Sequence, residues 1–377
     1  MKRRSFLQAA AGLPLFAQAP KQPPKTEWIA WIGTYTNAKS KSQGIYAYRW
    51  IPGEHKFTSL GLAAETVSPS FVAVHPNQQY LYAVNEVSTG GLSAFKIDPA
   101  SGQLKFLNKV SSKGADPCHL AVERGGRWVY VANYSSGSVA AFPIQSDGSL
   151  GEASAFAQHS GSSVNPQRQK GPHAHDTVLS PDNRFVMVAD LGLDQILAYP
   201  IEADSGGMNV RDPIVNKMAA GSGPRHLVFR PDGKFVYVLS EMGCTVTSYK
   251  YSPQRALFED PQAVSTLPEG YTGNKSGAEI AIRGNFLYAS NRGHDSIATF
   301  RIDPASGHLS AAGHTATQGK TPRNFAIDPT GGYLIAANQD SDNVVLFRLD
   351  GRTGGLTPTG EVWNVGAPVC VAFSNVK

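Results

Sequence analysis

One pattern recurs seven times along the chain, and it constrains the fold more than any other feature. A typical copy has a Pro-x-x start, an apolar triplet, a turn with Pro or Gly, a second apolar run, and then Asn or Asp. The copies are 45 to 57 residues apart and begin at Pro69, Pro117, Ala174, Pro224, Gly277, Pro322 and Pro368. A repeat of this length, with alternating polar and apolar residues and no helical pattern, is typical of a β-propeller blade.

The two ends of the chain complement each other. The last copy stops after one strand, Pro368–Ser374, whereas the chain start supplies three strands and no first one: Trp28–Thr34, Gly44–Trp50 and Phe57–Ala63. Pairing the ends in one blade would leave no open sheet edge. We therefore expect an all-β fold, a seven-bladed β-propeller over residues 28–377. Its blades should be four-stranded and antiparallel, and the N- and C-terminal segments should close the ring.

The first residues are expected to be an export signal. Lys2, Arg3 and Arg4 precede Ser-Phe-Leu, a short apolar run and small residues near position 19. This order is typical of a twin-arginine signal peptide over residues 1–19, with a linker over residues 20–27. We expect an exported, periplasmic protein, or a cytoplasmic one if the signal is not used. An ordinary N-terminal tail is the alternative.

Composition limits the partners. A formal charge of +5 over 377 residues is too weak to indicate a nucleic-acid partner. The apolar run near the N-terminus is too short to span a bilayer, so we expect no membrane contact in the mature form. Cys118, Cys244 and Cys370 form no C-x-x-C motif and are expected to be buried apolar residues in strands. We expect a monomer without a cofactor or metal.

The repeat also indicates which residues surround one mouth of the central channel. The start of the first strand and the end of the second strand of each blade lie on the same face of the disc. Charged side chains gathered at a narrow mouth are costly unless they are paired or solvated, so they suggest a site. Fourteen residues lie at the start of a first strand or just after a second strand, and we call them the mouth positions: Ser70, Cys118, His175, Arg225, Ala278, Arg323, Val369, Thr34, Glu86, Tyr134, Leu191, Glu241, Arg292 and Gln339.

Other repeat features carry separate expectations. The Asn residues before several mouth positions are expected to close turns. The longest connection, residues 159–173, leads to His175 and should therefore end at the mouth. Long ordered loops are often functional, although a disordered insertion is the alternative. A second polar stretch, residues 268–276, is expected on the same face.

Four segments carry a resemblance to a known family: N-P-Q-R-Q-K-G-P-H-A-H at 165–175, G-P-R-H at 223–226, L-S-E at 239–241, and A-E-I with Y-A-S-N-R-G-H-D-S-I at 278–280 and 288–297. With them, nearly the whole mature chain resembles the seven-bladed propeller lactonase family. This family includes a class of 6-phosphogluconolactonases and the fungal carboxy-muconate cyclases. The resemblance implies the active-site residues His175, Arg225, Glu241 and Arg292, with His173 as the competing histidine. All four already belong to the mouth positions.

The chemistry of lactone opening leaves the residue roles open. Water needs a base, and the developing oxyanion needs a positive group. Glu241 fits the base if its surroundings raise its pKa, and His175 fits near its ordinary pKa. Arg225 or Arg292 suits the oxyanion. The candidates for substrate binding are His173, Arg323, Glu86, Tyr134, Glu279 and Gln339.

Two of the charged candidates also suggest the substrate. Arg292 and Arg323 suit an acidic sugar lactone, because a guanidinium binds phosphate or carboxylate with two donors. A structural ion pair, such as Glu241 with Arg225, is the alternative for the charged set. His173, His175 and Asp176 have a spacing that a metal could use, but it is generic.

We therefore expect a carboxylic-ester hydrolase that opens a sugar lactone, as the resemblance implies. The expected substrate is 6-phosphogluconolactone or a related acidic sugar lactone. Export would favour another lactone, because the phosphorylated one is made in the cytoplasm. The alternatives are a muconate-type lactone cycloisomerase and a non-catalytic propeller that binds a ligand or a protein.

Overall fold

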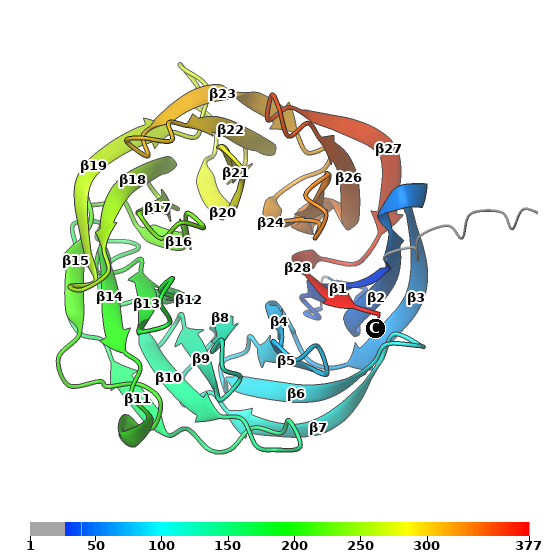
Figure 1. Cartoon of the computed structure of the whole chain (residues 1–377), viewed down its shortest axis with the longest axis horizontal. Helices are drawn as coiled ribbons and strands as arrows, with labels where there is room; N and C mark the ends of the chain where they lie inside the picture. Colours follow the sequence, from blue (N-terminus) through cyan, green and yellow to red (C-terminus); the bar gives the residue numbers. More distant parts are fainter. Residues whose placement is uncertain (1–26, 39, 377) are drawn as a thin grey trace, which may run out of the picture.

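The computed structural model describes residues 27–38 and 40–376, which form seven four-stranded antiparallel sheets around a common axis (Figure 1). The expected seven-bladed propeller is therefore confirmed. The expected signal peptide lies outside the described residues, as does most of the expected linker. Among the described residues, no helix has the length and hydropathy that a membrane span requires.

We number the blades from the first complete repeat copy. Blades 1 to 3 are formed by β4 (Val72–Val74), β5 (Tyr80–Asn85), β6 (Gly91–Asp98), β7 (Gln103–Ser111); β8 (Pro117–Val122), β9 (Trp128–Asn133), β10 (Ser138–Pro143), β11 (Ala155–Gln158); and β12 (Ala174–Leu179), β13 (Phe185–Asp190), β14 (Gln195–Pro200), β15 (Ile214–Lys217). Blades 4 to 6 are formed by β16 (Pro224–Phe229), β17 (Phe235–Ser240), β18 (Thr245–Ser252), β19 (Leu257–Ser265); β20 (Ser276–Arg283), β21 (Phe286–Arg292), β22 (Ser296–Ile302), β23 (Leu309–Ala316); and β24 (Pro322–Ile327), β25 (Tyr333–Asn338), β26 (Asn343–Leu349), β27 (Leu356–Asn364). Three short 3-10 helices lie in connections: η1 (Pro52–Glu54), η2 (Ala203–Ser205) and η3 (Gln339–Ser341).

Blade 7 joins the two ends of the chain, as expected. Its strand order is β28 (Pro368–Asn375), β1 (Trp28–Thr34), β2 (Gly44–Ile51) and β3 (Lys56–Glu65). In Figure 1 the red C-terminal strand lies against the blue N-terminal strands. The Trp31 indole Nε1 donates a buried hydrogen bond of 2.9 Å to the Ser374 hydroxyl. The ring is therefore closed by backbone pairing and by this side-chain bond.

The hydrophobic core lies between the blades. Seven clusters of buried apolar residues occur, and each combines side chains from two neighbouring blades. One example places Trp31 and Ile45 of blade 7 against Leu81 and Phe95 of blade 1. The inner strands are buried on both faces, which explains why their apolar runs are nearly continuous.

A bulge in the first strand of blades 2 to 6 positions the mouth residues. In blade 3, Ala174 pairs with Asp190 and Asp176 pairs with Ala189, so His175 between them has no partner in the ladder. The same shift skips Arg225 and Arg323. A bulge changes the direction of a side chain, and a Pro at the start of several of these strands favours one because it cannot donate to the ladder.

All three cysteines are free and buried, as expected. Cys118 and Cys370 lie in β8 and β28. Cys244 lies in the turn between β17 and β18 with a φ of 49°, so the expectation that it is a strand residue was wrong.

Candidate active site

A cavity of about 380 Å³ lies at the predicted mouth and receives side chains from all seven blades. Seven of the fourteen mouth positions line it, and the loop of residues 159–173 contributes Arg168, so the prediction that this loop reaches the mouth is confirmed. The lining residues are Tyr35, Glu86, Cys118, Tyr134, Arg168, His175, Glu241, Ser276, Arg292 and Arg323.

Glu241 binds three guanidinium groups. Its Oε1 lies 2.8 Å from Arg168, and its Oε2 lies 2.8 Å from Arg292 and 3.2 Å from Arg225. Burial opposes ionisation of this carboxyl, but the three arginines outweigh it and lower the pKa of Glu241 to about 2. The condition under which Glu241 would be the base, a raised pKa, is therefore not met. The ion pair with Arg225 that was the alternative is present.

A second carboxylate lies on the opposite side of the ring. The Tyr35 hydroxyl donates a 2.8 Å hydrogen bond to Glu86 Oε1, and Arg323 lies 3.9 Å from the same oxygen. The Arg323 guanidinium also lies 5.3 Å from the centre of the Tyr35 ring. Glu86 Oε2 is buried and has no hydrogen-bond partner within the part of the chain that the structure describes. Glu86 and Glu241 face four arginines, so two positive charges in this group are not compensated by these carboxylates.

His175 lines the cavity as a buried, neutral histidine. Burial and the nearby arginines, Arg225 first among them, hold the pKa of His175 well below its ordinary value. Its Nδ1 is buried and has no hydrogen-bond partner among the described residues. The ring meets the edges of Tyr134 and His226 at centroid distances of 5.5 and 5.2 Å. A neutral imidazole in this position can take up a proton from a bound water or ligand.

Four of the predicted site residues do not line the cavity. Arg225 lies behind Glu241, and burial lowers its pKa to about 10. His173 stacks on the Tyr134 ring and bonds its backbone oxygen, so His175 is the histidine of the cavity. Gln339 lines a neighbouring cavity, and Glu279 bonds His226 and Asn324.

Glu279 belongs to a second ring of polar residues next to the cavity. The third residues of several repeat copies accept the backbone N–H that the bulge of the next blade leaves free. Asp176 Oδ2 accepts from Leu227, and Asn324 Oδ1 accepts from Val371, both at 2.9 Å. His119 Nδ1 accepts from Thr177 at 3.2 Å.

This second ring includes a group of potential metal ligands. The ligand atoms of His119, Asp176 and His226 lie within 4.8 Å of one another. His119 and Asp176 already link neighbouring blades, and His226 Nδ1 bonds Glu279 at 3.0 Å. These bonds explain the polar residues as links between blades, and we assign no metal to them. The predicted set of His173, His175 and Asp176 is not brought together, because His173 stacks on Tyr134.

Three lining residues were named by the sequence analysis neither as site residues nor as mouth positions: Tyr35, Arg168 and Ser276. Cys118 was named only as a mouth position. Ser276 accepts a 2.6 Å hydrogen bond from Arg292, and it ends the polar stretch that was expected on this face. Tyr35 follows the mouth position Thr34 by one residue, and Arg168 lies inside the N-P-Q-R-Q motif. Both could have been found by including the neighbours of the mouth positions and the charged residues of the long loop.

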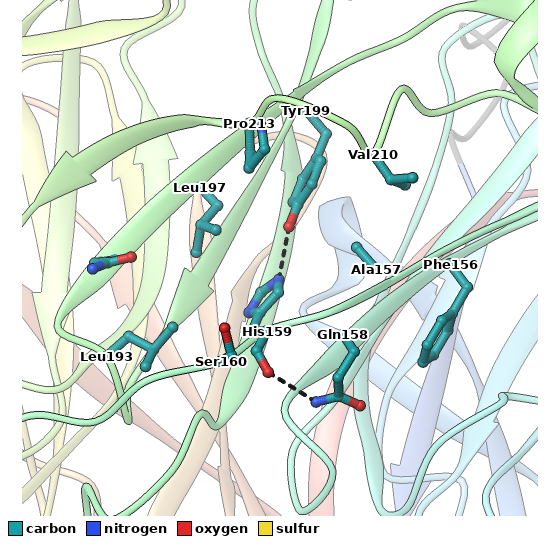
Figure 2. Close-up of a pocket in the computed structure, with 11 residues that line it drawn as sticks. Phe156, Ala157, Gln158, His159, Ser160, Leu193, Leu197, Tyr199, Val210 and Pro213 are labelled. Carbon is teal, nitrogen blue, oxygen red and sulfur yellow. Dashed lines mark hydrogen bonds between the residues drawn. The ribbon is translucent and has the colours of Figure 1, made fainter.

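A second cavity, of about 400 Å³, lies between blades 2 and 3 and is lined by β11, β14 and the start of the long loop (Figure 2). His159 Nδ1 bonds Asp190 at 2.6 Å, and its Nε2 bonds the Tyr199 hydroxyl at 3.0 Å. Asn85, Asn133, Asn291 and Asn338 occupy the position of Asp190 in other blades, and each donates to a carbonyl of the preceding connection. The hydrogen-bonded chain Asp190–His159–Tyr199 therefore has the same structural role in blade 3: it ties the blade to the connection that precedes it.

Residues 29–373 match the family model described as "Lactonase, 7-bladed beta-propeller". The chain belongs to this family. It is 38% identical to a 6-phosphogluconolactonase of Bacillus subtilis over 81% of this chain and 86% of that protein. It is 34% identical to a 6-phosphogluconolactonase of Formosa agariphila over 80% of this chain and 86% of that protein.

The chain is also similar to a solved structure that is described as a gluconolactonase. The periplasmic gluconolactonase PpgL of Pseudomonas aeruginosa is 32% identical and superposes with a TM-score of 0.88. The superposition covers 93% of this chain and 100% of that structure.

Proposed function

We propose that this propeller hydrolyses a sugar lactone, and that its substrate is 6-phosphogluconolactone or a closely related acidic sugar lactone. The observation that carries the proposal is the cavity itself: a neutral histidine, whose Nδ1 has no hydrogen-bond partner among the described residues, faces an excess of guanidinium groups. The family relatives support lactone hydrolysis, since they include both 6-phosphogluconolactonases and a gluconolactonase.

His175 is the proposed base. A water held by His175 attacks the lactone carbonyl carbon, and the water proton passes to the imidazole. The tetrahedral intermediate then collapses, the bond between the carbonyl carbon and the ring oxygen breaks, and the imidazolium returns its proton to the ring oxygen. One water is consumed, the product is a hydroxy acid, and His175 is neutral again.

Arg292 is the proposed oxyanion-stabilising group, and Glu241 holds it in place. One amino group of Arg292 donates to Ser276 at 2.6 Å and to the Gly277 carbonyl at 3.0 Å, and it lies 2.8 Å from Glu241 Oε2. Its Nε is buried without a partner among the described residues. A fixed guanidinium that lines the cavity can stabilise developing negative charge without having to reorganise.

The charge of the cavity supports an acidic substrate. Three arginines and two glutamates line the cavity, so the lining carries more positive than negative groups. An excess of positive charge in a buried site is costly, and an anionic ligand would offset it. The same ligand would help to accommodate the imidazolium that forms on His175 during the reaction. A neutral lactone would leave the positive charges uncompensated until the oxyanion forms.

The test offers the purified protein a panel of lactones that includes 6-phosphogluconolactone, glucono-lactone and a muconate lactone. We expect hydrolysis above the spontaneous rate, and we expect Arg292→Ala to lower kcat/KM by roughly 100- to 1,000-fold. Arg352→Ala, at an exposed turn of blade 6, is the matched control and should behave like wild type. If no lactone is hydrolysed, or if Arg292→Ala matches wild type, the proposal is wrong. Cycloisomerisation of the muconate lactone without hydrolysis would favour the cyclase alternative.

Export through residues 1–19 stays a prediction of the sequence, and fractionation of cells that express the full chain would test it. The PpgL relative is described as periplasmic, which agrees with an exported lactonase. The monomeric state also stays a prediction.

A further inference from the structure

The four arginines of the site differ in depth. The Arg292 and Arg323 side chains are each 16% exposed, and Arg225 is buried. Arg168 is 43% exposed and also lines the cavity. It is therefore the outermost guanidinium of the site, whereas the proposed base His175 is 3% exposed.

Arg168 also differs in its origin, because a loop carries it and the other three arginines come from strands. One of its amino groups bridges two blades, donating to the Tyr134 hydroxyl at 2.9 Å and to Glu241 Oε1 at 2.8 Å. No described residue accepts a hydrogen bond from its second amino group or its Nε. A guanidinium has five N–H donors in a fixed plane, so donors remain for an anion in the cavity.

The loop that carries Arg168 is held in one conformation by its own hydrogen bonds. The Asn165 side chain accepts the backbone N–H groups of Gln167 and Arg168 at 2.9 and 3.0 Å. The fully buried Gln169 side chain accepts from the Asn165 backbone and donates to the Leu191 carbonyl. These bonds fix the backbone on both sides of Arg168.

The two ends of the loop are tied to a single side chain. Asp190 accepts from the His159 ring at 2.6 Å, where the loop begins, and from the His173 backbone N–H at 2.8 Å, where it ends. Near the end of the loop, the Gly171 backbone packs closely against Gly192. A Cβ added at Gly192 would lie 2.0 Å from the Gly171 carbonyl oxygen. Arg168 is therefore presented by a rigid support, as a recognition residue requires.

The depth difference orients a bound lactone. A lactone whose carbonyl carbon reaches the buried His175 must point its far end outward, towards Arg168. We propose that Arg168 is the specificity-determining residue that selects sugar lactones with a phosphate at the end opposite the carbonyl. This inference rests on the proposed lactonase activity. It adds that the site favours a phosphorylated sugar lactone over a neutral one.

The experiment compares kcat/KM for 6-phosphogluconolactone and glucono-lactone in wild type and in Arg168→Gln. Loss of hydrogen bonds to a charged group should lower the preference for the phosphorylated substrate by roughly 10- to 100-fold. Lys170→Gln is the matched control, because it removes one exposed positive charge from the same loop outside the cavity. It should change the preference by less than about twofold, since exposed charges are screened.

A binding measurement separates recognition from catalysis. Inorganic phosphate should inhibit wild-type hydrolysis of glucono-lactone competitively, and Arg168→Gln should weaken this inhibition about tenfold or more. Arg168→Lys keeps the charge but loses the planar fork, so it should restore part of the preference. Thermal unfolding of each variant shows whether the fold is kept.

The outcomes are distinct. If wild type hydrolyses neither lactone, the proposed function fails. If it prefers the neutral lactone, if Arg168→Gln lowers both kcat/KM values equally, or if Lys170→Gln has the same effect as Arg168→Gln, the inference about Arg168 is wrong while the lactonase activity stands.

Discussion

At the scale of single residues, the site depends on the placement of charge more than on the number of charged groups. Glu241 is ionised because three guanidinium groups surround it, and His175 is neutral because it is buried near the same groups. The same positive charge therefore lowers both pKa values, and the two residues receive different roles. Both carboxylate oxygens of Glu241 are engaged by guanidinium groups, whereas the His175 imidazole is neutral and lines the cavity, which is why we propose His175 as the base.

This assignment predicts the pH dependence of the reaction. Because the base must be neutral and its pKa lies well below 6.5, kcat/KM should stay constant from pH 8 to below pH 6.5 and should fall only at lower pH. An ordinary histidine would give a fall centred near 6.5. Initial rates corrected for spontaneous hydrolysis would measure the profile.

Replacement of the proposed base belongs to the same prediction. His175→Asn should lower kcat/KM by roughly 100- to 10,000-fold. His308→Asn, in an outer turn of blade 5, serves as the control and should keep both the rate and the profile. A wild-type profile centred near 6.5, or an active His175→Asn variant, would show that another group is the base.

The repeat predicted most of this site from the sequence, because the phase of a strand determines which side chains reach the mouth. His175, Glu241 and Arg292 were found in this way. The position in the repeat alone did not show that Arg225 would not line the cavity. Arg225 lies at an equivalent position to His175 but behind Glu241. The low pKa of Glu241 was not predictable either, since it depends on three side chains from different parts of the chain.

At the scale of elements, the long loop depends on a carboxylate where four other blades have Asn. Asp190 accepts hydrogen bonds from both ends of the loop and from Gly192 and Leu193. The sequence indicated that residues 159–173 reach the mouth, but not that Asp190 fixes them. The repeat places Asn and Asp at equivalent positions, so it does not indicate that Asp190 accepts hydrogen bonds from the loop where the Asn residues donate to a carbonyl.

Asp190→Asn tests this anchor. The amide keeps one oxygen for the backbone N–H groups, and His159 can change tautomer to accept from the new NH₂ group and donate to Tyr199. The variant should therefore fold but lose charge-assisted bonds, about 1–2 kcal/mol of local stability. Trypsin should cleave the loop after Arg168 or Lys170 roughly tenfold faster, in line with easier local opening.

The matched control for the anchor is Asp212→Asn, at an exposed position of the same blade. It should be cleaved at the wild-type rate. Equal cleavage of Asp190→Asn and wild type would mean that other contacts, such as those of Gln169, are sufficient to hold the loop.

At the scale of the whole molecule, the ring closure decides whether the seven blades unfold together. Every blade packs on two neighbours, and each of the seven interfaces has its own apolar cluster. In an open stack of repeats the terminal units would separate first. Here β28 and β1 belong to one sheet, so the two chain ends cannot separate without breaking a complete blade.

The bond between Trp31 and Ser374 tests this cooperativity, because it joins the two ends of the chain inside blade 7. Both side chains are fully buried, so Ser374→Ala leaves an unpaired indole N–H and should cost about 1–3 kcal/mol. Because the ring is closed, this loss should lower the free energy of unfolding of the whole propeller. Urea unfolding, followed by tryptophan fluorescence and far-UV circular dichroism, should give one transition at lower urea with the same slope.

The matched control is Ser310→Ala, in the exposed outer strand β23, which should change the free energy of unfolding by less than about 0.5 kcal/mol. Two separate transitions in Ser374→Ala would show instead that blade 7 opens on its own and that the closure does not bind the ring into one unit.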